Sequence, residues 1–105
     1  MTGKTRKQQI EEMLADDPED PFLNYGLAME HVSAGDDEAA ATTFQELLAA
    51  SPKYVPTYLM LAQTLVRLNR EDEAKAVLRT GVGVAGHEKD LHAQGELQGM
   101  LDSLD

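Results

Sequence analysis

Residues 58–81 read YLMLAQTLVRLNREDEAKAVLRTG, and a similar order of large, small and polar residues stands 34 positions earlier, at residues 24–47. The same offset joins residues of like size: Ile10, Phe44 and Leu78; Leu27 and Leu61; Ala28 and Ala62; Ala40 and Ala74. Within each copy the apolar residues recur every three or four positions, which is the spacing of one face of an α-helix. A fixed period of this length is typical of stacked repeats, each built from a pair of helices.

Turn-forming residues between the apolar stripes divide the chain into about six predicted helices. Pro21 and Pro56 are placed to start two of them, and Gly35 and Asn69 to end two of them. The chain is therefore predicted to be a single all-α domain over residues 1–105, made of antiparallel helices. Its predicted parts are an N-terminal half-repeat helix in residues 5–18, one hairpin over 21–54, a second hairpin over 55–86 and a C-terminal capping helix over 89–104.

The equivalent positions of the two hairpins resemble those of the tetratricopeptide repeat family. In the second hairpin they hold Tyr58, Leu61, Ala62, Leu65, Ala74, Leu78, Gly81 and Gly86, and in the first Asn24, Leu27, Ala28, His31, Ala40, Phe44, Leu47 and Pro52. The alanines stand where paired helices cross, and a larger side chain there would push the helices apart. The resemblance implies a right-handed α-α superhelix, whose concave face is lined by the first helix of each hairpin and holds a peptide or helix of another protein.

The chain departs from this family pattern in three places. Asn24 stands where the family usually has an aromatic residue, and His31 occupies an apolar core slot. The leucines of the last helix come 36 positions after those of the second hairpin: Leu97, Leu101 and Leu104 against Leu61, Leu65 and Leu68. We therefore expect a two-residue insertion in the loop at residues 86–90, followed by an atypical terminal helix.

The charge of the chain limits the kinds of partner it can bind. The net charge is −10, and Lys4, Arg6 and Lys7 are three of only nine basic residues, whereas all nineteen acidic residues come after them. Such a surface repels phosphate backbones, so we expect no nucleic-acid partner and favour an apolar or basic polypeptide. The chain has no cysteine and no apolar run long enough to span a membrane, and we expect a cytoplasmic protein without a membrane partner.

Three sequence motifs point to chemistry, and each has a simpler explanation. Residues 81–86, GVGVAG, match G-x-G-x-x-G, but a helix precedes them instead of a strand, so we expect a loosely wound helix end and no nucleotide site. His87 and His92 lie one residue too far apart for the H-E-x-x-H zinc motif. The acidic clusters fall at helix junctions, where capping explains them. We therefore expect no catalytic residue, no cofactor and no metal, and predict that the chain is not an enzyme.

The candidate site is the exposed part of the predicted concave face. Its residues lie on the first helices of the two hairpins: Tyr25, Met29, Val32, Leu59, Met60, Gln63 and Arg67. The aromatic and aliphatic members offer apolar contacts beyond those that the core needs. They favour a non-catalytic interaction module that binds an apolar or basic peptide segment of another protein. Two alternatives stay open: self-association into homo-oligomers through the same surface, and burial of this face by the chain's own terminal helix.

Overall fold

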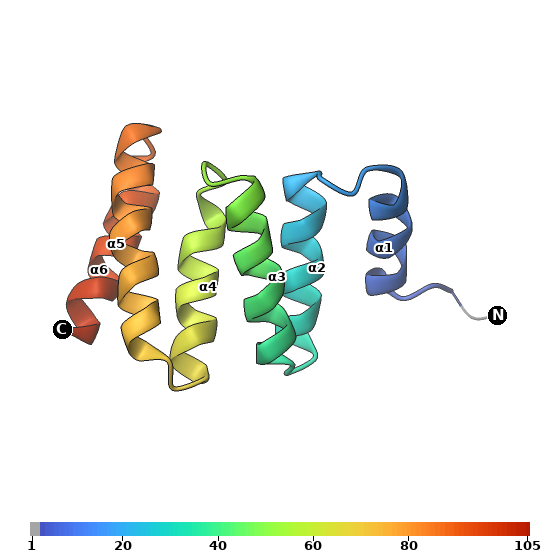
Figure 1. Ribbon diagram of the computed structural model, residues 1–105, viewed down its shortest axis with the longest axis horizontal. Coiled ribbons are helices and arrows are strands. Elements are labelled where there is room, and N and C mark those ends of the chain that lie inside the picture. Colours follow the sequence, from blue (N-terminus) through green and yellow to red (C-terminus); the bar gives the residue numbers. More distant parts are fainter. Residues whose placement is uncertain (1–2) are drawn as a thin grey trace.

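The computed structural model describes residues 3–105, which form six helices and no strand. The helices are α1 (Arg6–Asp16), α2 (Pro21–Ser33), α3 (Asp37–Ala50), α4 (Pro56–Arg67), α5 (Glu71–His87) and α6 (Leu91–Leu104). Each helix packs against its neighbour in the chain, and α4 also contacts α6, so that the helices form a row measuring 49 × 29 × 21 Å (Figure 1). The predicted all-α superhelix of antiparallel hairpins is therefore confirmed. None of the six helices combines the length and apolarity needed to cross a bilayer.

Local sequence signals set most of the helix boundaries. The side chains of Asp20, Asp36 and Asp90 each accept a hydrogen bond from a backbone N–H in the first turn of α2, α3 and α6, respectively. These bonds satisfy N–H groups that have no partner within the helix. Left-handed residues follow the ends of α2, α4 and α5: Gly35 (φ 77°), Asn69 (φ 61°) and Lys89 (φ 61°). Each turns the chain sharply, so that the next helix runs back along the previous one.

Helix α5 differs from its predicted form. It stays helical through the glycine-rich residues 81–86 to His87, so the expected loose helix end is wrong. It has 17 residues against 14 in α3, and the additional residues extend its C-terminal end. Tertiary contacts hold this end: Ala85 is fully buried, and the Gln94 side chain donates to the carbonyl of Val82. The additional residues therefore lengthen the helix and leave a short connection at residues 88–90.

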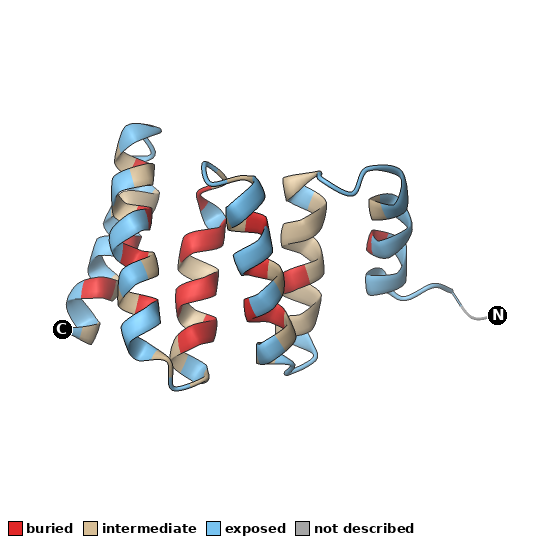
Figure 2. Cartoon of the chain, viewed as in Figure 1, coloured by how far each residue is buried: buried red, intermediate tan, exposed pale blue. Residues whose placement is uncertain are grey.

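Buried side chains concentrate in α3, α4 and α5, whereas α1 contributes a single one, Ile10 (Figure 2). The small residues predicted at the helix crossings are fully buried: Ala28, Ala40, Ala62 and Ala74. Large side chains fill the space beside them, and Phe44, Leu61, Leu65 and Leu78 have almost no exposed surface. The connected core therefore runs from α2 to α6, is thickest in the second hairpin, and does not include Ile10 of α1.

Gly81 of α5 lies against both α4 and α6. A Cβ atom on Gly81 would lie 2.7 Å from the Tyr58 Cβ and 3.2 Å from a Leu97 methyl group. Tyr58 itself is almost fully buried, and its hydroxyl donates a hydrogen bond to the carbonyl of Pro52. The predicted packing role of Gly81 thus has a direct geometric basis, because Cβ atoms near a backbone cannot move aside as a flexible side-chain end can.

We predict that Gly81→Ala destabilises the fold by about 1–3 kcal/mol, because the added methyl group overlaps Tyr58. Gly83→Ala is the matched control. A Cβ at Gly83 meets nothing within 4 Å, and alanine is the better helix former by about 0.5–1 kcal/mol. Urea denaturation followed by circular dichroism should therefore move the two variants in opposite directions. Equal stability of the two variants would contradict the packing role of Gly81.

We also predict that Tyr58 makes the stability depend on alkaline pH. Burial raises the pKa of its phenol above the ordinary value of about 10. Its contribution is therefore complete below the pKa of the unfolded chain and is lost as the pH rises through the higher folded pKa. Tyr58→Phe should lose about 1 kcal/mol at neutral pH through the missing hydrogen bond, and less above pH 10. Denaturation curves at several pH values test this, and a constant difference between the two proteins would exclude it.

Candidate functional site

A cleft of about 260 Å³ lies between helices α2, α4 and α6, the first helices of the successive hairpins. Its floor and walls are mostly apolar, from Tyr25 of α2, Leu59 and Met60 of α4, and Ala93 and Leu97 of α6. These residues come together because the first helices follow one another along one side of the row. The cleft is therefore an apolar hollow on the side of the molecule where the sequence places the concave face.

Part of the predicted site lines this cleft and part of it lies elsewhere. Tyr25, Leu59 and Met60 are lining residues. The other four predicted residues are outside the lining: Met29, Val32, Gln63 and Arg67. Met29 and Val32 are half-buried and pack against the core, and Gln63 is also half-buried. A contact between these four residues and a partner stays a prediction.

Tyr25 belongs both to the cleft and to the aromatic packing beneath it. The centre of its ring lies 5.9 Å from that of Phe44 and 5.8 Å from that of Tyr54, both in tilted arrangements. Burial is the larger cause that raises the pKa of the Tyr25 phenol, and the neighbouring Tyr54 raises it further. The hydroxyl therefore stays protonated at neutral pH. Because the ring also supports the core, truncating Tyr25 would disturb the fold as well as the cleft.

One rim of the cleft is acidic and comes from α6. Asp90 caps this helix by accepting a hydrogen bond from the backbone N–H of Ala93. One turn further on, an exposed carboxylate of Glu96 lies 3.4 Å from the His92 imidazole. Asp90 and Glu96 were not predicted from the sequence, because the last helix was interpreted as a cap. The 36-residue spacing of its leucines would have found one of them, since it aligns Glu96 with Met60. The terminal helix, which the sequence left open as a cover for this face, forms one wall of the cleft.

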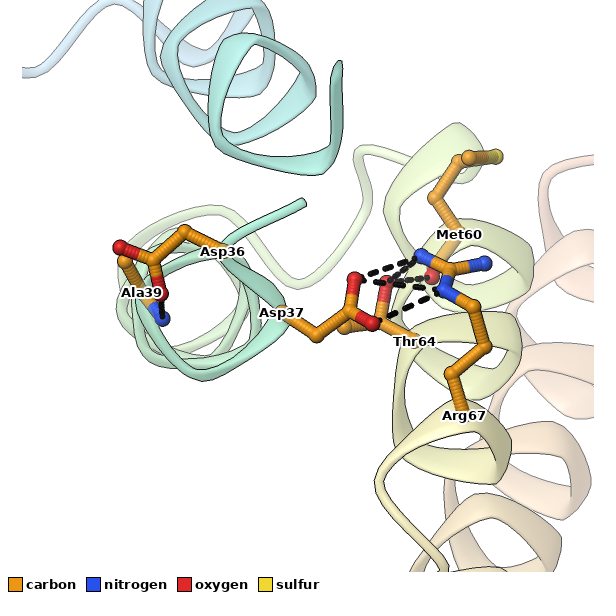
Figure 3. Close-up of polar contacts among 6 residues, drawn as sticks. All are labelled: Asp36, Asp37, Ala39, Met60, Thr64 and Arg67. Atoms are coloured by element: carbon orange, nitrogen blue, oxygen red, sulfur yellow. Dashed lines mark hydrogen bonds and ion pairs between the residues drawn. The ribbon is translucent and has the colours of Figure 1, made fainter. Parts of the chain in front are cut away.

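Arg67 is engaged within the chain, at the boundary between the two hairpins (Figure 3). Its Nε and Nη2 atoms donate to the carboxylate of Asp37 over 3.1–3.2 Å, and Nη2 also donates to the Thr64 hydroxyl. The Thr64 hydroxyl donates in turn to the Met60 carbonyl. Asp37 lies in the first turn of α3 and Arg67 is the last residue of α4, so both helix dipoles favour the pair. This contact ties the first hairpin to the second.

The histidine motif that points to metal chemistry is divided between two helices. His87 ends α5 and His92 lies in α6, so the two imidazoles belong to different helices. Among residues 3–105, no group of three or more histidine, aspartate or glutamate side chains could hold a metal ion. His31, expected in a core slot, is half-buried near the end of α2.

Antiparallel helix pairs stacked in one direction, with a cleft along their first helices, define a helical solenoid. The sequence model of the tetratricopeptide repeat family matches residues 31–94, which is more than half of the chain. The chain therefore belongs to the tetratricopeptide repeat family, as its sequence predicted.

Individual relatives agree with this assignment. A tetratricopeptide repeat domain protein from Salinibacter ruber, solved by NMR, is 36% identical, covers 84% of this chain and 89% of its own, and superposes with a TM-score of 0.80. A TPR repeat-containing protein of Pseudomonas aeruginosa is 28% identical over 96 residues, or 91% of each chain. PcrH, solved in complex with the chaperone binding region of PopD, covers 93% of this chain and 74% of its own with a TM-score of 0.85. At 15% identity, its likeness concerns the fold alone.

We predict that Asp37 and Arg67 stabilise the fold by a coupled contribution of about 0.5 kcal/mol, because both side chains are partly exposed and solvent screens them. A double-mutant cycle with Asp37→Asn and Arg67→Gln measures this coupling. The coupling should shrink at high salt. If the two single variants were additive at low salt, the ion pair would contribute nothing to stability.

Proposed function

We propose that this chain is a non-catalytic interaction module, which binds an apolar segment with flanking lysine or arginine residues from another protein. The observation that carries the proposal is the composition of the cleft between α2, α4 and α6. Its apolar floor includes Leu59 and Met60, and its α6 rim carries the carboxylates of Asp90 and Glu96.

The physical chemistry of the cleft suits such a segment. An apolar side chain of the partner would displace water from the floor, which is the main favourable term in binding. A neighbouring basic group would lie beside the acidic rim and gain electrostatic attraction that also speeds encounter. The net charge of −10 acts in the same direction. Methionine adapts to partners of different shape, which favours recognition of a residue pattern over a single sequence.

The fold likeness to a known chaperone is consistent with this proposal. PcrH was solved with a binding region of PopD, so an array of similar shape holds a segment of another protein. The likeness does not extend to the identity of the partner, because the two chains share only 15% of their residues. The proposal therefore rests on the residues of the cleft in this chain.

The test is a selection from a random peptide display library on the immobilised wild-type protein. We predict that selected peptides are enriched in apolar residues next to lysine or arginine. They should bind Leu59→Lys at least about tenfold more weakly, because a charge then lies in the apolar floor. Glu96→Lys should disfavour the more basic peptides in particular. Both measurements can be made by calorimetry or fluorescence anisotropy.

Gln45→Lys is the matched control, since it adds the same positive charge to an exposed position of α3 outside the cleft. Circular dichroism should show the same helix content for all three variants. Peptides that bind Leu59→Lys as tightly as the wild type would exclude the cleft as the binding site. Selected peptides without basic residues would exclude the proposed role of the rim.

A further inference from the structure

One face of α1 is exposed, whereas the equivalent faces of α3 and α5 are covered by other helices. Met13 of α1 is equivalent to Leu47 of α3 and Gly81 of α5. Leu47 is 3% exposed and Gly81 is buried, but Met13 is 49% exposed. In α5 the covering group is Tyr58, which belongs to the preceding helix α4. Among residues 3–105, α1 has no preceding helix to cover it.

A groove marks this open place. It lies between α1 and α2, has a volume of about 250 Å³, and is lined by Ile10, Met13 and Phe22 among other residues. Phe22 is 69% exposed, although phenylalanine is usually buried. We call this surface the head groove. The space equivalent to the head groove is filled by α2 beside α3 and by α4 beside α5. An antiparallel helix of this type would therefore fit the head groove.

The opposite end of the row offers a helix of that type. Within the described residues, α2 is followed by α3 and α4 by α5, but α6 has no following helix. Leu91, at the start of α6, is 73% exposed, and Gln98 and Asp102 are also exposed. We call this exposed side of α6 the tail face. The large apolar side chains exposed in residues 3–105 are thus confined to the two ends of the row: Met13, Phe22 and Leu91.

The charges of the two ends are complementary in the orientation that a hairpin requires. In an antiparallel pair, the end of α6 lies beside the start of α1. Asp102 stands in the last turn of α6, which contains no lysine or arginine. Lys4, Arg6 and Lys7 stand at the start of α1 and are exposed; Lys4 pairs with Glu12 and Arg6 with Glu30 of the same chain, and both pairs lie at the surface.

We infer that copies of this chain associate head to tail, with α6 of one copy in the head groove of the next. The contact forms a hairpin from α6 and the α1 of the neighbouring copy, and continues the packing already present within each chain. It uses a surface separate from the cleft between α2, α4 and α6, because Leu91, Gln98 and Asp102 are not among the cleft's lining residues. Because the two faces differ, association is heterologous and extends beyond a dimer.

One residue makes this contact weak. By the 36-residue spacing, Gln98 holds the slot that Ala62 fills in α4, where the paired helices cross closely. The Gln98 side chain is exposed and donates to Asp102 over 2.9 Å, so it must turn aside when a helix docks. Gln98→Ala should therefore tighten the association by about tenfold.

Sedimentation velocity over a wide range of protein concentrations is the test. The wild type should show a rising mean mass, which falls again at high salt. Met13→Glu in the head groove and Leu91→Glu on the tail face should each remain monomeric. Met13→Glu keeps an intact tail face and Leu91→Glu keeps an intact head groove. Mixed in equal amounts, the two variants should therefore form a dimer and no larger species. Gln45→Glu, with the same added charge on the exposed side of α3, should behave as the wild type.

Three results would overturn the inference. The first is a wild type that stays monomeric at every concentration. The second is self-association of Leu91→Glu alone, which would indicate a symmetric contact between two head grooves. The third is a mixture of Met13→Glu and Leu91→Glu that stays monomeric while the wild type associates. Peptide binding in the cleft should survive both substitutions, so failure here is distinguishable from failure of the proposed function.

Discussion

Paired helices approach each other closely in this fold because small residues stand where they cross. Helices α4 and α5 cross with Ala62 and Ala74 fully buried, and Gly81 leaves no room for even one more carbon atom. Because the helices pack so tightly, each hairpin has a fixed shape, and the next hairpin must follow in a fixed direction. The cleft is a consequence of that direction, since it forms where successive first helices lie along one side of the row.

The helices and most of their ends were predictable from sequence because the signals are local. Asp20 and Asp36 cap helices that follow them directly, and Asn69 turns the chain within a few residues of α4. The end of α5 was not predictable in this way. Its glycines disfavour a helix on their own, and contacts with α6 outweigh that preference.

The candidate site was only partly predictable, because it depends on residues that are distant in sequence. Tyr25, Leu59 and Met60 were found since they occupy known positions of a repeated pattern. The acidic rim of α6 was missed because this helix breaks the 34-residue period. The engagement of Arg67 was also missed, since its partner Asp37 lies 30 positions away and no repeat position marks the pair.

The thin core at α1 has a consequence for how the molecule loses its structure. Each helix is held by its neighbours in the row, so opening does not require the whole array to separate at once. With Ile10 as its one buried side chain, α1 has the least to lose on detaching from α2. Local opening therefore costs the least free energy in α1 and the most in α4, which contains more buried residues than any other helix. Unfolding is therefore expected to begin at α1 and to proceed along the row towards α4.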